Sequence, residues 1–307
     1  MIEVQGLTKK YGELEAVRGL TFGVEAGRIW GLLGPNAAGK TTTMRILTGY
    51  LPATSGRAVV AGFDVFDKPD DVKRSIGYLP EVVPLYQDMT VESYLAFVAE
   101  IKKVPKAKRK AAVARVVGSA GLGDVRRRLI RNVSRGYKQR VGIAQAMIHD
   151  PKVLVLDEPT IGLDPAQIRE IRELIRSLRG EHTILLSTHI LPEVTQVCDG
   201  VVIIDHGRLK ASGSLAELAA SFEKNDGVLL RLRSAGPAEA LLFKTVPGVG
   251  SSSLEGDEIR VEWPRGRDLR DDVARLALDK GLGLKEMRSV AGIEELYMKI
   301  VAGGLEQ

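Results

Sequence analysis

The sequence predicts an α/β protein built on a parallel sheet, followed by a small α+β domain. Short apolar runs rich in β-branched residues alternate with amphipathic helical segments through about residue 215, and the texture changes after Gly213. Strands that alternate with helices pair in parallel, and their helices cover both faces of the sheet. We therefore expect domains at residues 1–215 and 216–307.

Composition limits the class of protein. The 307 residues, of which 44% are hydrophobic and 27% charged, suit a soluble globular protein of one large or two ordinary domains. Cys198 is the only cysteine, so an internal disulfide is excluded and a reducing compartment is expected. The N-terminus lacks a signal-peptide pattern, and no apolar run approaches the roughly 20 residues that span a bilayer. Any membrane role must then come from a partner.

The strands of the first domain are predicted from two patterns. Residues 2–25 alternate around glycines like antiparallel strands, which predicts an antiparallel flap. Near-continuous apolar runs predict strands that are covered on both faces. These runs are IWGLL (29–33), VLVLD (153–157), TILLS (183–187) and VVIID (201–205).

Two helical regions accompany these strands. Residues 166–179 have the apolar stripe of an amphipathic helix, with Asp164 as N-cap and Pro165 at its first position. That stripe is Ile168, Ile171, Ile175 and Leu178. Residues from about 85 to 150 predict a helical, base-rich subdomain, in which Lys102–Arg115 contains seven bases and no acid. Such a run can meet nucleic acid or an anionic leaflet, although a solvated helical face is the favoured interpretation.

The C-terminal domain predicts the ferredoxin-like order β-α-β-β-α-β between residues 227 and 290, and a last helix at 292–301. It contains no catalytic constellation. We expect a small interaction or regulatory domain whose role the sequence does not define.

GPNAAGKT at 34–41 fits the eight-residue phosphate-loop pattern. Strand 29–33 precedes it, a helix over 40–48 follows, and Gly49 is the expected C-cap glycine. The loop amides and the helix N-terminus would surround phosphate oxygens, Lys40 would reach the β- and γ-phosphates, and Thr41 would hold Mg²⁺. The expected phosphate-binding residues are Gly34, Pro35, Asn36, Ala37, Ala38, Gly39, Lys40, Thr41 and Thr42.

The run VLVLDEP ends in two carboxylates at the same edge of the sheet. Asp157 would enter the Mg²⁺ coordination sphere, and Glu158 would polarise the attacking water as general base. A buried strand often ends in an acid, so the two carboxylates alone are weak evidence. The phosphate loop beside them is what indicates a functional role. Together they predict hydrolysis of a nucleoside triphosphate.

The stretch 132–165, NVSRGYKQRVGIAQAMIHDPKVLVLDEPTIGLDP, resembles the ATP-binding cassette (ABC) ATPases. Ser134 and Gly136 stand where that family carries its LSGGQ signature, which implies that they bind the γ-phosphate of ATP held by a second copy. The physics is again that of an anion at a helix N-terminus. By itself, Ser134 would be interpreted as an ordinary N-cap. Its spacing to VLVLDEP favours the functional role.

Further matches cover about residues 2–215. Tyr11 resembles the aromatic residue that stacks on adenine, with packing on its own hairpin as the alternative. Asp164, in GLD, resembles the loop through which two cassettes sense each other. His189 follows a buried strand at the place of the γ-phosphate histidine. The resemblance thus implies a P-loop ABC ATPase cassette that uses ATP and Mg²⁺ in a homodimer.

The sequence departs from the family at three places. Ala37 replaces a frequent glycine, and it would cost roughly 1–2 kcal/mol if the position required a positive φ. Arg135 and Tyr137 replace signature residues. Glu81, in IGYLPE, replaces the usual glutamine near Mg²⁺ and can still ligate the metal. GYLPE with SRGYKQR resembles the gliding-motility-like exporter branch, whose members pair with separate type-two permeases; residues 82–101 match the segment beneath the permease.

The resemblance implies the ATPase subunit of a transporter on the cytoplasmic face of the cell membrane, and the branch resemblance implies export. Integral-membrane permease subunits and a second copy are the expected partners, and nucleic acid is not. A soluble mechanical ATPase of ribosome or DNA is the alternative, favoured only by the basic run. A P-loop kinase or GTPase is opposed by VSRGYKQR and His189.

Overall fold

The computed structural model describes residues 1–222, 225–264, 266–289 and 297. The chain divides into two units, Met1–Leu215 and Ala216–Gln307. No helix among the described residues combines the length and apolar character that crossing a membrane requires. The helix expected over 292–301 lies outside the described residues, apart from Tyr297.

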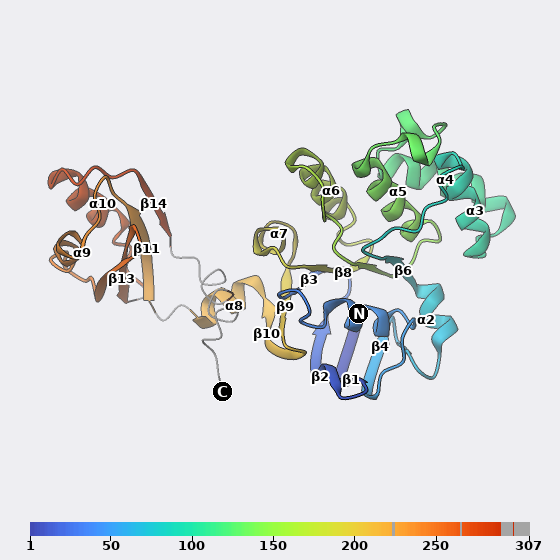
Figure 1. Ribbon diagram of the computed structural model, residues 1–307, viewed down its shortest axis with the longest axis horizontal. Coiled ribbons are helices and arrows are strands. Elements are labelled where there is room, and N and C mark those ends of the chain that lie inside the picture. Colours follow the sequence, from blue (N-terminus) through green and yellow to red (C-terminus); the bar gives the residue numbers. More distant parts are fainter. Residues whose placement is uncertain (223–224, 265, 290–296, 298–307) are drawn as a thin grey trace. The chain divides into compact units, whose positions relative to one another are not determined.

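The apolar runs of the first unit form a sheet of six strands within the described residues, in the order β10-β9-β3-β8-β7-β6 (Figure 1). Neighbours are parallel except for β10, which runs antiparallel to β9. Every residue of β3, β7, β8 and β9 is buried, as their continuous apolar character requires. The bounds are β3 Ile29–Leu33, β6 Ile76–Leu79, β7 Val153–Leu156, β8 Thr183–Thr188, β9 Gly200–Asp205 and β10 Arg208–Ser214.

A second, antiparallel sheet in the order β2-β1-β4-β5 is the expected flap. Its inner side chains, including Leu7 and Leu20, share one core with Trp30 of β3 and with Met44 and Leu47 of helix α1. Figure 1 shows this layer on one side of the parallel sheet and α5, α6 and α7 on the other. The bounds are β1 Ile2–Tyr11, β2 Leu14–Val24, β4 Ser55–Val60, β5 Phe63–Asp64, α1 Lys40–Leu47, α6 Pro165–Ser177 and α7 Leu191–Val197.

The helical subdomain expected at about 85–150 contains α3 (Val91–Ile101), α4 (Lys106–Ser119) and α5 (Arg135–Met147), which pack on one another. A shorter helix, α2 (Pro69–Ser75), precedes β6. Short 3-10 turns at Gly123–Val125 and Ile130–Asn132 lead into α5.

The second unit alternates strand, helix, strand, strand, helix and strand, with the sheet order β12-β13-β11-β14 and antiparallel neighbours. Trp263 and Phe243 lie in its own core. α8 (Leu215–Phe222) begins at the boundary between the units. The other bounds are β11 Asn225–Arg231, α9 Pro237–Phe243, β12 Ser251–Glu255, β13 Glu258–Pro264, α10 Arg270–Asp279 and β14 Glu286–Ser289.

Candidate active site at the carboxyl edge of the parallel sheet

The loop between β3 and α1 turns the chain tightly at the carboxyl end of β3. Gly39 has φ 101°, and a Cβ atom there would lie 2.6 Å from the carbonyl oxygen of Ala16, so glycine is required. The amide of Thr43 donates to the Gly39 oxygen at 2.9 Å, as the first α-helical bond of α1. The amides between them lie at the N-terminus of this helix, where phosphate oxygens bind.

Ala37, in the same loop, has φ 65°, which is the left-handed conformation. The position therefore does require a positive φ. A residue with a Cβ atom is destabilised there by roughly 1–2 kcal/mol, and the loop tolerates that cost.

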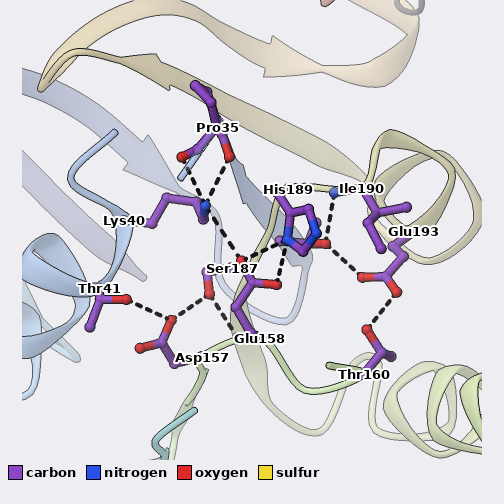
Figure 2. A network of polar contacts seen from close by, with 12 residues as sticks. Pro35, Lys40, Thr41, Asp157, Glu158, Thr160, Ser187, His189, Ile190 and Glu193 are labelled. Atoms are coloured by element: carbon purple, nitrogen blue, oxygen red, sulfur yellow. Dashed lines mark hydrogen bonds and ion pairs between the residues drawn. The ribbon is translucent and has the colours of Figure 1, made fainter. Parts of the chain in front are cut away.

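Lys40 lies inside the loop that precedes it (Figure 2). Its Nζ donates to the carbonyl oxygens of Gly34 at 2.8 Å and Pro35 at 3.1 Å, and it is 3.4 Å from Oε1 of Glu158. Both charged side chains are buried, with exposures of 6% and 7%. Each compensates the charge of the other in a site that excludes most water.

β7 ends at Leu156, one residue earlier than expected, so Asp157 directly follows the strand. Its Oδ1 accepts hydrogen bonds from Ser187 Oγ at 2.6 Å and Thr41 Oγ1 at 3.4 Å. Its Oδ2 is buried and has no hydrogen-bond partner among the described residues. A buried carboxylate oxygen left in this state fits a cation, since burial without a partner is costly.

Glu158 has φ 47°, an unusual conformation for a side chain of its size. Its amide donates to Ser187 Oγ at 2.9 Å, and its Oε2 is 3.1 Å from Nδ1 of His189. β8 thus places Ser187 and His189 beside the two carboxylates that follow β7 (Figure 2). Strained backbone of this kind concentrates at functional sites.

A second polar cluster, which sequence reasoning missed, supports this edge. Glu193 of α7 is 3% exposed and accepts hydrogen bonds from Thr160 Oγ1 at 2.5 Å and Thr188 Oγ1 at 2.7 Å. The guanidinium of Arg172 lies 3.8 Å from it. The cluster ties α7 to the segments that carry Glu158 and His189. Ser187 was missed as well, although a serine inside an apolar strand is a usable signal.

The chain matches known proteins over nearly its whole length. The model of the ABC transporter family matches residues 17–161. The bacitracin transport ATP-binding protein BcrA of Bacillus licheniformis is 42% identical, over 99% of this chain and 98% of its own. The chain belongs to the ABC transporter ATP-binding subunits.

Two further relatives agree with this assignment. The daunorubicin/doxorubicin resistance ATP-binding protein DrrA of Streptomyces peucetius is 38% identical over 78% of this chain and 74% of its own. A solved ATP-binding subunit of an ABC transporter has 31% identity and a TM-score of 0.65, and covers 72% of this chain and 93% of that chain. The cassette is therefore an ATP-binding ATPase, as the stretch 132–165 predicts.

Two residues expected at the nucleotide lie apart from the network of Figure 2. Tyr11 ends β1 and is 46% exposed, with Nζ of Lys9 5.3 Å from its ring centroid. Glu81 is exposed just beyond β6. Neither has a polar contact with Asp157 or Glu158 in the described part of the chain.

The residues expected to act on a second copy lie at the N-termini of α5 and α6. Ser134 caps α5, and its Oγ accepts the amide of Tyr137 at 3.3 Å. Asp164 caps α6 and accepts the amide of Gln167 at 2.9 Å. The two helices meet closely, because a Cβ atom on Gly136 would lie 2.8 Å from Cδ of Gln167. Both caps are exposed, so a second molecule has access to them.

Proposed function

We propose that two copies of this cassette hydrolyse ATP at shared sites and thereby drive a separate membrane permease. The observation that carries the proposal is the position of Glu158, which has Lys40 at 3.4 Å and His189 at 3.1 Å. Lys40 would bind the β- and γ-phosphates, and His189 the γ-phosphate. Glu158 would accept a proton from the attacking water as the bond between the γ-phosphorus and its bridging oxygen breaks, releasing ADP and phosphate.

We assign the Mg²⁺ of this reaction to Asp157, Thr41 and Glu81. The unpartnered Oδ2 of Asp157 and the adjacent Thr41 hydroxyl support the first two ligands. Oxygen ligands of this kind suit Mg²⁺, which, when bound, neutralises charge on the phosphate oxygens. Glu81 would add a carboxylate from the segment after β6.

In the same proposal, Ser134, Gly136 and Asp164 act on the second copy. The N-terminus of α5, a helix of 13 residues, offers amides to the γ-phosphate held by the partner. Asp164 would contact the partner cassette while it caps α6. Tyr11, exposed at the end of β1, would stack on adenine.

The permease would dock on a groove of about 510 Å³ between the parallel sheet and the helical subdomain. Tyr50 and Tyr78 line it, and the neighbouring segment exposes 81% of Val82 and 54% of Tyr86. Exposed apolar side chains gathered in this way mark interaction sites. A cytoplasmic helix of the permease is the occupant we propose, which places the cassette on the cytoplasmic face of the cell membrane without a role for nucleic acid.

We further propose that the transporter exports a drug, since similar proteins are named for bacitracin transport and for daunorubicin and linearmycin resistance. The GYLPE and SRGYKQR motifs support the gliding-motility-like branch. Residues 1–215 would be the nucleotide-binding domain and 216–307 an accessory domain. The strand order β12-β13-β11-β14 supports a ferredoxin-like architecture for the latter.

Co-purification from detergent-solubilised native membranes tests this proposal. Tagged Glu158→Gln protein with ATP and Mg²⁺ should recover a polytopic membrane protein. A Tyr50→Asp/Val82→Asp change in this background should lose it, whereas Phe66→Asp, equally exposed but outside the groove, should keep it. Recovery of ribosomal or DNA-bound proteins in place of a membrane protein would contradict the transporter role.

A further inference from the structure

We propose that the first unit carries a second anion site, a basic cavity that binds a phosphate-bearing compound. The cavity has a volume of about 810 Å³ and is formed by α2, the end of α3, α4 and the turn between α5 and β7. That volume falls within the range of about 300–1,000 Å³ typical of small-molecule sites. Four bases of the run Lys102–Arg115, which the nucleotide site does not use, line this cavity: Lys102, Lys103, Lys108 and Arg115.

The cavity is separate from the ATP site. Its lining residues His149 and Asp150 precede the amino end of β7, whereas Asp157 and Glu158 follow the carboxyl end of the same strand. None of its lining residues belongs to the phosphate loop. An anion bound here would therefore not compete directly with the phosphates of ATP.

Positive charge dominates the lining. It includes six lysine or arginine residues and two aspartates. Arg115 pairs with Asp150 at 3.6 Å, and Arg74 pairs with Asp71 at 3.1 Å. In contrast, the ammonium groups that line the cavity, which come from α2, the end of α3 and α4, form no ion pair or side-chain hydrogen bond within the described residues. They belong to Lys73, Lys102, Lys103 and Lys108.

His149 adds a buried polar atom that lacks a partner. Its Nε2 is 3.1 Å from the carbonyl oxygen of Ile76, which makes this nitrogen the donor and leaves Nδ1 as an acceptor. Nδ1 is buried without a hydrogen-bond partner among the described residues. A phosphate held by the lysines beside the ring would favour the protonated form of His149 by its charge.

The local electrostatics agree with this assignment. Burial and the nearby Lys102 lower the pKa of His149 to about 4, and burial lowers the pKa of Lys102. Both shifts show that positive charge is disfavoured here unless an anion compensates it. A bound phosphate would raise the pKa of both groups.

The backbone is strained at the same place. Lys103 and Asp150, which both line the cavity, have φ of 59° and 57°. Left-handed residues other than glycine concentrate at functional sites and ligand clamps. Ala37 and Glu158, at the ATP site, share this property.

Pyrophosphate binding, measured by calorimetry, tests the proposal. All proteins carry Lys40→Ala, so that the phosphate loop does not bind the probe. The cavity variant adds Lys73→Ala, Lys102→Ala and Lys108→Ala. The control adds Lys68→Ala, Lys106→Ala and Lys110→Ala, which remove equal charge from the N-cap of α2 and from α4, outside the cavity. We expect one site per chain, unchanged in the control and at least about 100-fold weaker in the cavity variant.

Two further measurements separate the sources of the phosphate. Proton NMR of His149 should show its pKa rising when pyrophosphate binds. If the natural ligand is a lipid headgroup, the parent and the control should sediment with vesicles of phosphatidylglycerol but not with vesicles of phosphatidylcholine. The cavity variant should stay in the supernatant with both. The proposal would be overturned if the cavity variant bound both probes as well as the control does. It would also be overturned if the parent bound neither pyrophosphate nor the vesicles.

Discussion

The hydroxyl of Ser187 donates to Oδ1 of Asp157 at 2.6 Å, and the same oxygen of Ser187 accepts the amide of Glu158 at 2.9 Å. One side chain of β8 therefore holds the carboxylate of Asp157 and the backbone of Glu158, which both follow β7. The metal-binding residue and the proton acceptor are thus positioned by the same strand.

Ser187→Ala should lower kcat of ATP hydrolysis by about tenfold or more and raise the Mg²⁺ concentration needed for half-maximal rate, because Asp157 loses its orientation. Steady-state ATPase assays over a Mg²⁺ series measure both effects. Ser177→Ala is the matched control, since within the described residues the Ser177 hydroxyl bonds only the Leu174 carbonyl oxygen of its own helix. An unchanged Mg²⁺ dependence would show that Ser187 does not position Asp157.

Glu193→Ala should lower the free energy of unfolding by about 2–4 kcal/mol, because it leaves two buried hydroxyls without their acceptor and removes the carboxylate 3.8 Å from Arg172. Urea denaturation measures this loss. Glu181→Ala, on an exposed turn, should change stability by less than about 0.5 kcal/mol. Equal stabilities of the two variants would contradict the supporting role of the cluster.

Ala37→Gly should stabilise the protein by up to about 1 kcal/mol, because it relieves the left-handed strain at φ 65° and offsets the greater flexibility of unfolded glycine. Thermal denaturation measures the gain. Ala61→Gly, at φ 53° outside the phosphate loop, should give a similar gain. Destabilisation by Ala37→Gly alone would show that the Ala37 methyl group has a packing role that outweighs the strain.

Stability should fall as the pH decreases from about 6.5 toward 4, because unfolded His149 binds a proton in this range and the folded side chain, whose pKa is lowered to about 4, does not. We expect a contribution of about 1–2 kcal/mol between about pH 7 and pH 5, given partial solvent screening. Urea denaturation at pH 7 and at pH 5 measures the free energy of unfolding at each pH. In the His149→Gln variant, the difference between the two values should be smaller by that contribution. An identical pH dependence of parent and variant would refute it.

The sequence predicts the parallel core well, because runs such as 29–33 have few residues that could face water, and the structure has β3 at Ile29–Leu33. Asp157, Glu158 and His189 can be predicted from the sequence because they lie within two residues of the end of an apolar strand, at the edge where the phosphate loop begins. The contacts of Ser187 and Glu193 depend on which strands lie side by side, which local patterns do not specify. The basic cavity joins residues from α2, α4 and the turn before β7, so the run 102–115 alone indicated only a solvated face.

The role of Glu158 as the base is tested by measuring ATP hydrolysis by Glu158→Gln together with the molar mass of this variant in solution. Turnover should fall by about 10²–10⁴-fold, while ATP with Mg²⁺ should convert the variant to a stable dimer. Ser134→Ala in the same background should weaken that dimer without loss of ATP binding by the monomer. Hydrolysis by Glu158→Gln at the parental rate would contradict the assignment of Glu158 as the base.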